Sequence, residues 1–173
     1  MSQAQPTYTP EFIVTFRDMM LQGLQMEMQS TKKVLAAVPD SGHDYRPDPK
    51  ARTAKELAWH LAAEDVKFLD GIANLAFGTT KAGPAPATTA EIVNWYDTNL
   101  PRAAARVQAM SAEQLLTPVE FFGMFNLPAA MYLNFMYGHS VHHRGELAVY
   151  LRPMGSKVPS IYGPSADDDM RAA

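Results

Sequence analysis

Four long stretches of the sequence carry apolar residues at intervals of three and four, which is the pattern of amphipathic helices. The first begins at Thr9, a good capping residue followed by Pro10, and ends before Pro39. Its apolar positions are Phe12, Phe16, Met19, Met20, Leu24, Met28, Val34, Leu35 and Val38. No convincing run of strands accompanies these stretches, so the core must form where helices pack on one another.

Two further helices begin at capping boxes, in which a threonine and a glutamate three residues later bond each other's backbone N–H groups. Thr53 with Glu56 begins one of them, and Thr88 with Glu91 begins the other. Their apolar faces consist of Leu57, Leu61, Phe68, Leu69 and Ile72 in the second helix, and of Ile92, Trp95, Tyr96, Leu100, Ala103 and Val107 in the third. Pro101 lies inside the third helix and predicts a kink or a break there.

The fourth long helix is predicted to begin near Asn126, with Pro128 in its first turn, and to end at about Leu151. Before it, Ser111 can cap a short helical turn. The intervening stretch TPVEFFGMFN is either an extended segment or a packed loop. Together these segments predict an all-α fold, a four-helix bundle with long crossover connections.

The length of 173 residues and the 47% of hydrophobic residues predict a single domain over residues 1–173. Its core is expected over about residues 10–155, followed by a C-terminal tail at residues 156–173. The last part of this tail, DDDMRAA from Asp167 onward, is expected to be loose.

The charge of the chain argues against some classes of partner. The formal net charge is −3 and the basic residues are scattered, whereas a nucleic-acid-binding surface normally carries a basic stripe. The N-terminal sequence lacks the basic and apolar regions of a signal peptide, and no apolar run reaches the roughly 18 residues of a membrane span. A cytoplasmic protein that binds neither nucleic acid nor membrane is therefore expected.

The histidines are the chemically informative residues. The chain contains no cysteine, which leaves His, Asp and Glu as its metal-ligating side chains. Three of its five histidines lie in the segment GHSVHHRGEL. On a helix, His139 and His143 are separated by about 40° around the axis, so both imidazoles lie on one face. This spacing suits a divalent metal, although a pair supplies only two ligands.

The third ligand could be His60, which lies mid-helix in ELAWHLAAED. Burying a neutral imidazole without a partner costs about 1–3 kcal/mol, and a metal shared with the fourth helix would supply one. Glu64, one turn after His60, and Glu146, one turn after His143, are candidates for a general base or a further ligand. His142 is expected at the edge of the site as a surface residue or an outer partner, and His43 is expected to be solvated.

Four pieces of the chain together resemble the DinB-like (damage-inducible) superfamily of small metal-binding four-helix bundles. They are VPDSGHDYRPDPKARTAKELAWHLA, the FLDGI that follows, HSVHHRGEL and YLRPMG. Their order and separation match that family from about Phe12 to Gly155, and the combination of Trp-His-Leu with His-x-x-x-His-Arg-Gly is fairly specific. Nothing in the chain resembles the DNA polymerase of similar name.

The resemblance implies a divalent metal held by one histidine of the second helix and two of the fourth, which map onto His60, His139 and His143. Zinc or nickel is expected there because imidazole suits both ions. The family commonly has glutamine where this chain has Glu146, so this carboxylate could become a ligand.

Two more residues match the family pattern. Arg144 is expected to meet either an acidic group or a substrate, and Tyr45 is expected either to contribute to binding at one end of the bundle or to anchor a loop. Relatives are often dimers, so a homodimer is also expected.

Three histidines with an open coordination position are typical of a catalytic metal site. Such a site can lower the pKa of a bound water for attack on a carbonyl or phosphoryl centre, or it can hold a thiol as a thiolate. Some relatives are thiol-dependent S-transferases and others are described as hydrolases, so a small-molecule substrate and a low-molecular-weight thiol are the expected partners. The alternative is a non-catalytic bundle in which the metal staples two helices, with a role in stress response or partner binding.

Overall fold

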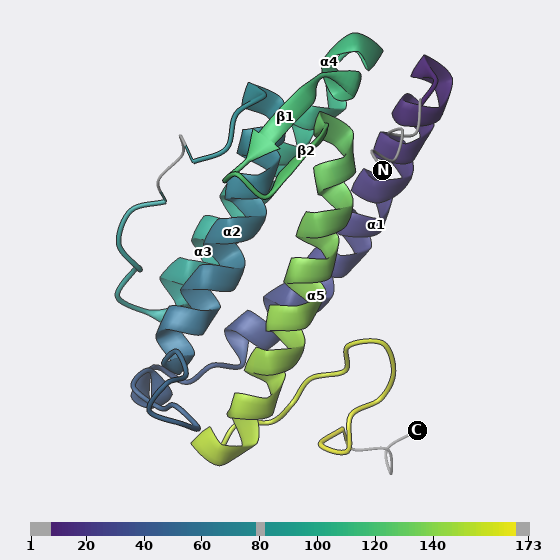
Figure 1. The fold of residues 1–173 in the computed structure, drawn as a ribbon. Helices are drawn as coiled ribbons and strands as arrows, with labels where there is room; N and C mark the ends of the chain where they lie inside the picture. The colour runs from purple at the N-terminus through teal and green to yellow at the C-terminus, as the bar shows by residue number, and fades with distance from the viewer. Residues whose placement is uncertain (1–7, 79–81, 169–173) are drawn as a thin grey trace, which may run out of the picture.

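The computed structural model describes residues 8–78 and 82–168 of the chain (Figure 1). Its long helices are α1 (Pro10–Ala36), α2 (Ala54–Asn74), α3 (Thr89–Gln108) and α5 (Tyr132–Leu151). Shorter elements are η1 (Asp40–Gly42), α4 (Ala112–Leu116), β1 (Pro118–Phe121), β2 (Phe125–Pro128), η2 (Ala129–Met131) and η3 (Arg152–Met154). The predicted all-α bundle is therefore confirmed, with a small hairpin added.

The helices begin where their capping residues predict. The side chain of Thr9 accepts a hydrogen bond from the backbone N–H of Phe12 at the start of α1. Both bonds of a capping box are present at Thr53, at Thr88 and at Ser111. Because these bonds satisfy backbone donors that a helix leaves unpaired, they fix the first turn of each helix.

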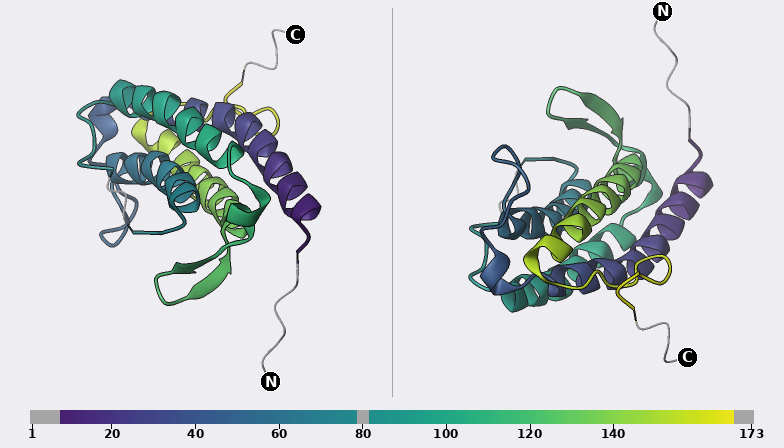
Figure 2. Two further views of the ribbon diagram at one scale, coloured as in Figure 1. Left: turned by 90° about the horizontal axis from the view of Figure 1, so that it is seen from above. Right: turned by 90° about the horizontal axis from the view of Figure 1, so that it is seen from below.

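The four long helices form a bundle with diagonal connections. Helix α2 packs against α3 and α5, and α1 packs against the same two helices. Consecutive helices α1 and α2 therefore lie across the bundle from each other, which is the predicted crossover arrangement (Figures 1 and 2). The core between them is aliphatic, with side chains such as those of Leu35, Leu57, Leu61, Leu69 and Leu147 fully buried at 0% exposure.

The prediction that the fourth helix begins near Asn126 is wrong. Strands β1 and β2 pair in antiparallel register over this stretch, so its extended alternative is correct, and α5 begins only at Tyr132. The hydroxyl of Tyr132 donates to the carbonyl of Val119 at 2.6 Å and ties the hairpin to the start of α5. Pro128 is the last residue of β2 and the N-cap of η2, the 3₁₀ turn that leads into α5, so it precedes the helix instead of lying in its first turn.

The turn of this hairpin holds a bulky residue in a left-handed conformation. Phe122 has φ of 50° and Gly123 has φ of 72°. Positive φ at both central residues is what a tight hairpin turn requires, and Asn-Gly is the sequence that usually supplies it. For a side chain as large as that of Phe122, this conformation costs roughly 1–2 kcal/mol.

Helix α3 continues through Pro101 from Thr89 to Gln108, so the break that this proline allowed does not occur. Leu100 and Ala103 on either side of it are buried at 1% and 3% exposure. Their packing offsets the loss of one helical hydrogen bond, because helix stability in a protein comes largely from its buried face.

The C-terminal tail is more ordered than predicted. The carboxylate of Asp167 pairs with Arg152 at 2.9 Å and accepts the backbone N–H of Val158 at 2.8 Å. Asp168 accepts from the hydroxyl of Ser160 at 2.5 Å. The expectation of a loose segment from Asp167 onward is therefore wrong for these two residues, and the remainder of DDDMRAA lies outside the described residues.

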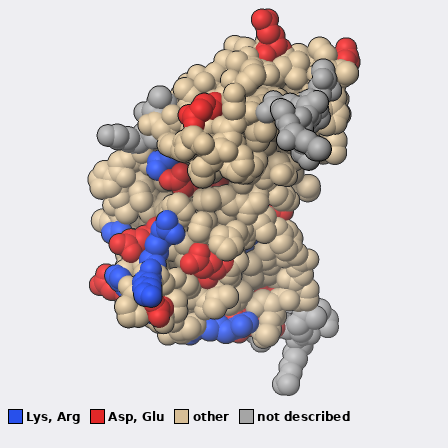
Figure 3. Space-filling view, in the orientation of Figure 1, with Lys and Arg blue, Asp and Glu red and all other residues tan. Residues whose placement is uncertain are grey.

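No helix within the described parts of the chain is long and apolar enough to cross a membrane. On the face seen in Figure 1, basic side chains are mixed with acidic ones and form no continuous stripe (Figure 3).

A buried carboxyl group, that of Asp65, lies in the bundle core beside α5. Asp65 is 0% exposed, and its Oδ2 accepts hydrogen bonds from the hydroxyls of Tyr96 and Ser140, each at 3.0 Å. Its Oδ1 has no hydrogen-bond partner among the described residues. Burial, opposed by these two hydrogen bonds, raises the pKa of Asp65 to about 7.

This carboxyl group predicts a measurable pH dependence. The folded protein keeps the proton on Asp65 up to about pH 7, whereas the unfolded chain loses it near the ordinary pKa value of 3.8. The free energy of unfolding therefore falls as the pH rises between these two values. The unmodified protein should lose stability between about pH 5 and pH 8, and Asp65→Asn should lose less, because asparagine carries no titrating proton. Urea denaturation of both proteins at the two pH values measures this difference. An identical pH dependence for the two proteins would contradict this assignment.

Candidate metal centre

The packing of α2 against α5 brings three histidines together. Nε2 of His60 lies 3.2 Å from Nε2 of His139 and 3.3 Å from Nε2 of His143. In a tetrahedral site with metal–nitrogen bonds of about 2.0–2.1 Å, the ligand nitrogens are separated by about 3.3–3.4 Å. These three side chains could therefore hold one divalent ion through their Nε2 atoms.

The chemistry of the three rings favours a cation between them. A neutral imidazole carries one proton, so a single proton on His60 Nε2 can satisfy only one of its two close contacts. The remaining contact would set lone pairs against each other. A cation shared by the three nitrogens removes that conflict, because each lone pair then points at positive charge.

Protonation is not the state that this environment favours. Burial lowers the pKa of His60 to about 4, with smaller contributions from the positive charges of Arg52 and His143. Burial likewise lowers the pKa of His139 to about 4, followed by the effects of His143 and His60. The two imidazoles are therefore neutral at physiological pH and present lone pairs, which is the form that ligates a metal.

Two carboxylates lie behind the histidines. Oε2 of Glu146 is 2.8 Å from Nδ1 of His143, and Oε1 of Glu64 is 3.9 Å from Nδ1 of His60. A carboxylate that accepts from Nδ1 fixes the tautomer in which Nε2 carries the lone pair. Glu146 thus acts here as an orienting partner of His143, while Oε1 of Glu64 also pairs with Lys67 at 2.6 Å.

The position of Glu146 predicts its effect on metal affinity. Loss of an outer hydrogen-bond partner of a metal-ligating histidine typically lowers affinity about 10–100-fold. We expect Glu146→Ala to lower zinc affinity by that factor, measured by competition with a chelator. Glu146→Gln, which can still accept from Nδ1, is expected to retain most of the affinity, and a glutamine variant as weak as the alanine one would contradict the orienting role.

A second grouping of His142, His143 and Glu146 could also hold an ion. His142 is exposed. His143 already contacts His60 through Nε2, and the carboxylate of Glu146 already pairs with Nδ1 of His143. We therefore take His60, His139 and His143 as the candidate centre.

The remaining predicted residues lie outside this cluster. Tyr45 packs edge-on against Tyr150 with ring centroids 5.7 Å apart, which is a contact expected of a loop anchor. The prediction that His43 is solvated is wrong. Its Nε2 lies 2.9 Å from the hydroxyl of Thr89, and its side chain is only 12% exposed.

Arg144 meets an acidic group, the first of its two predicted alternatives. Its guanidinium is 1% exposed and lies 2.5 Å from the carboxylate of Glu27 on α1. Nη1 also lies 3.3 Å from the hydroxyl of Thr31, and Nη2 donates to the hydroxyl of Tyr162 in the tail at 2.5 Å. Tyr162 in turn donates to Glu27 at 2.9 Å. This network ties α1, α5 and the tail together, which gives Arg144 a structural role.

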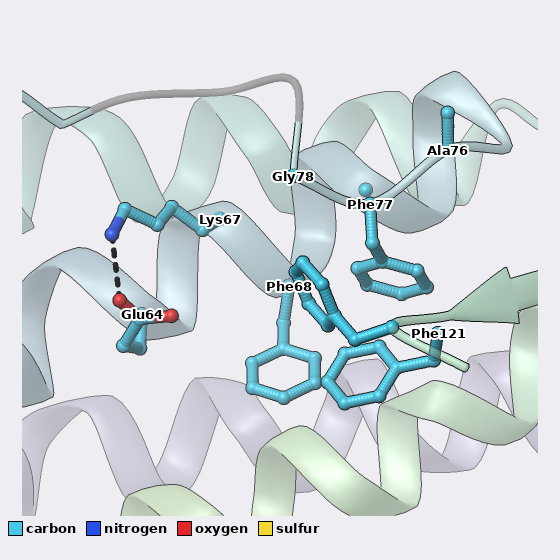
Figure 4. Close-up of a pocket in the computed structure, with 9 residues that line it drawn as sticks. Glu64, Lys67, Phe68, Ala76, Phe77, Gly78 and Phe121 are labelled. Atoms are coloured by element: carbon cyan, nitrogen blue, oxygen red, sulfur yellow. Dashed lines mark hydrogen bonds and ion pairs between the residues drawn. The ribbon is translucent and has the colours of Figure 1, made fainter. Parts of the chain in front are cut away.

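An aromatic pocket of about 290 Å³ lies between α2, the segment after it and the hairpin (Figure 4). Phenylalanines dominate its wall, with a polar pair at one side; the lining residues are Glu64, Lys67, Phe68, Gly71, Ala76, Phe77, Gly78, Phe121 and Phe122. The ring of Phe68 packs against that of His139 with centroids 5.7 Å apart, and Glu64 faces His60. The pocket and the candidate metal centre therefore share these two walls.

Sequence reasoning missed this pocket, since its phenylalanines come from α2, the segment after it and the hairpin. Gly71 was the available signal. A Cβ at this position, in the last turn of α2, would overlap the ring of Phe77, so glycine is what allows Phe77 to lie against α2.

The comparisons with known proteins agree with this fold. The DinB family model matches residues 6–170. The chain is 27% identical over 156 residues to YrdA of Bacillus subtilis (strain 168), covering 87% of this chain and 90% of that protein. A crystal structure of a DinB-like protein from Bacillus cereus ATCC 10987 matches with a TM-score of 0.71 and 30% identity, over 83% of this chain and 95% of the other. A DinB-like protein from Bacillus subtilis, YjoA, has the same fold with a TM-score of 0.67 at 17% identity, over 84% and 99% of the two chains. The chain belongs to the DinB family.

Proposed function

We propose that the protein is a metal-dependent enzyme of hydrolase or thiol S-transferase type, in which His60, His139 and His143 hold zinc or nickel. The observation that supports this most directly is the convergence of three Nε2 atoms while the neighbouring carboxylate of Glu146 faces Nδ1 of His143 instead of the centre. Three nitrogen ligands leave a coordination position for a small molecule, as in catalytic zinc sites.

Such an ion, when bound, would supply Lewis-acid activation of a carbonyl or phosphoryl group, or hold a thiol as a thiolate. The residues of the chain have separate tasks around it. Glu146 orients His143 through Nδ1. Glu64 lies on the Nδ1 side of His60, but it also lines the adjacent pocket, where a substrate could reach its carboxylate, and this makes it the candidate general base.

The alternative is a bundle in which the metal only staples α2 to α5. A staple gains stability when a fourth protein ligand closes the site, whereas Glu146 is engaged by His143. The pocket beside the histidines also favours the enzyme, because concave, largely apolar sites with a few polar groups are typical of small-molecule binding.

Activity screening tests this proposal. The zinc-loaded and nickel-loaded proteins would be assayed against aryl and alkyl esters, and against electrophiles together with low-molecular-weight thiols. We expect turnover in one of these two arms, and its loss in Glu64→Gln if Glu64 is the base. Absence of turnover in both arms, with one metal ion per chain confirmed, would favour the staple.

We also propose that the protein acts in the cytoplasm as a homodimer and binds neither nucleic acid nor membrane. Exposed apolar side chains support self-association, since Met19 and Met26 on α1 are 67% and 69% exposed. Sedimentation equilibrium tests this, and a monomer at micromolar concentration would contradict the dimer.

A further inference from the structure

The aromatic pocket combines rings from three separate parts of the chain. Phe68 comes from α2, Phe77 follows that helix, and Phe121 is the last residue of β1 (Figure 4). Phe122 follows in the turn of the hairpin. The ring of Phe121 stacks on Phe68 with centroids 5.7 Å apart and meets Phe77 edge-on at 4.8 Å. A wall built in this way presents both faces and edges of rings, which suits a flat aromatic guest.

Phe122 forms the outer part of this wall at a cost in backbone strain. Its φ of 50° is unfavourable for a bulky residue. Because Phe122 is 61% exposed, burial of its ring does not explain why a phenylalanine stands at this position. Its ring packs against Phe121 at 4.9 Å and lies over Gly78, where a Cβ would be 3.2 Å from the ring. Strained residues that persist next to a pocket are often there for function.

The size and position of the pocket define its guest. Its volume of about 290 Å³ exceeds the roughly 150 Å³ of an apolar cavity that holds benzene. The ring of Phe68 and the carboxylate of Glu64 border both the pocket and the histidines. The described residues that line the pocket include no histidine, so a molecule whose ring occupies it would reach the Nε2 atoms with a polar end that extends past Phe68 or Glu64.

We propose that this pocket binds a flat aromatic group of the substrate, with the strained Phe122 as a specificity-determining wall. The proposal rests on the proposed function, because it places the reactive end of the substrate at the metal centre. Lys67 and Glu64, paired at 2.6 Å, form the polar rim on the side of α2.

Hydroxamates that share a metal-binding head test this by calorimetry on the zinc-loaded protein. We expect benzohydroxamate to bind more than about 10-fold tighter than acetohydroxamate, since the phenyl ring buries apolar surface that a methyl group lacks. Cyclohexanecarbohydroxamate is expected to bind more weakly than benzohydroxamate, and equal binding would overturn the preference for a flat ring. Equal affinity of benzohydroxamate and acetohydroxamate would overturn the pocket itself.

The matched variants are Phe122→Asn and Met124→Asn, both in the same turn. Asparagine accepts the left-handed conformation, so Phe122→Asn is expected to fold with unchanged or higher thermal stability. It should lower benzohydroxamate affinity about fivefold or more, by loss of apolar contact, and leave acetohydroxamate unchanged. Met124, 62% exposed, does not line the pocket, and its variant is expected to bind both as before. If the ratio of benzohydroxamate affinity to acetohydroxamate affinity were unchanged in Phe122→Asn, the role of Phe122 would be overturned.

A metal-free arm separates this proposal from the proposed function. If neither hydroxamate binds, the metal-dependent function fails, and 4-fluorobenzyl alcohol then probes the pocket alone by ¹⁹F NMR. Line broadening with the unmodified protein that is lost in Phe122→Asn would support the pocket, and no broadening with either protein would overturn it.

Discussion

Replacing His60 with alanine is expected to lower zinc affinity more than 100-fold. Loss of an outer partner of a ligand already costs about 10–100-fold, and His60 Nε2 is itself the atom that contacts both other histidines. The variant should lose activity in whichever assay the unmodified protein passes. Chelator competition and elemental analysis of the purified variants measure the effect.

His142→Ala is the matched control, since it removes an exposed histidine next to the centre. Its zinc content and affinity are expected to match those of the unmodified protein. If His142→Ala lost the metal while His60→Ala retained one ion per chain, the centre would involve the other grouping of histidines.

Arg144→Met is expected to destabilise the fold by about 3–5 kcal/mol, because it leaves the buried carboxylate of Glu27 without its charged partner. This is the largest effect on stability that we predict for a single side chain. Urea denaturation followed by circular dichroism measures it, and the metal content of the folded fraction should not change.

The double variant Glu27→Met, Arg144→Met tests whether the loss comes from an unpaired charge. Replacing a buried ion pair by apolar side chains of similar size is often close to neutral. We expect the double variant to recover most of the stability that the single variant loses. A double variant as unstable as Arg144→Met would show that the hydrogen bonds to Thr31 and Tyr162, rather than the charge pair, hold the network together.

Local signals in the sequence were sufficient for the helices. The capping boxes at Thr53 and Thr88 and the intervals of three and four residues are short-range patterns, and they define where α2 and α3 begin and which of their faces are buried. The buried face of α1 was predicted less well, because Phe12 and Met19 are 48% and 67% exposed whereas Ile13 is fully buried.

The i, i+4 spacing of His139 and His143 is equally local. Convergence with His60 was predicted from a resemblance and from the need of a mid-helix imidazole for a partner, and the packing of α2 on α5 provides it.

Features that depend on contacts outside the regular helices were not predictable in the same way. The hairpin is held by the pairing of β1 with β2 and by the hydrogen bond from Tyr132 to Val119. Neither contact is visible in the sequence, where Pro128 alone is equally compatible with the start of a helix. Asp167 and Asp168 look like a solvated tail until Arg152 and Ser160 are seen beside them.

Burial of charge was the least predictable property. Arg144 lies one residue after His143 in the sequence, yet its side chain points to α1, where Glu27 neutralises it. A single helix turns neighbouring side chains by about 100°, so residues adjacent in the chain serve different faces. The aromatic pocket is likewise assembled from separate segments, and Gly71 of α2 is the one local signal of it.

A zinc-loaded crystal, measured with anomalous scattering at the zinc edge, would show whether the three histidines share one ion. We expect one strong peak at about 2.0–2.1 Å from Nε2 of each of His60, His139 and His143, with a non-protein ligand completing the site. A peak bound instead by His142 and Glu146, or no ordered peak with zinc in excess, would contradict it.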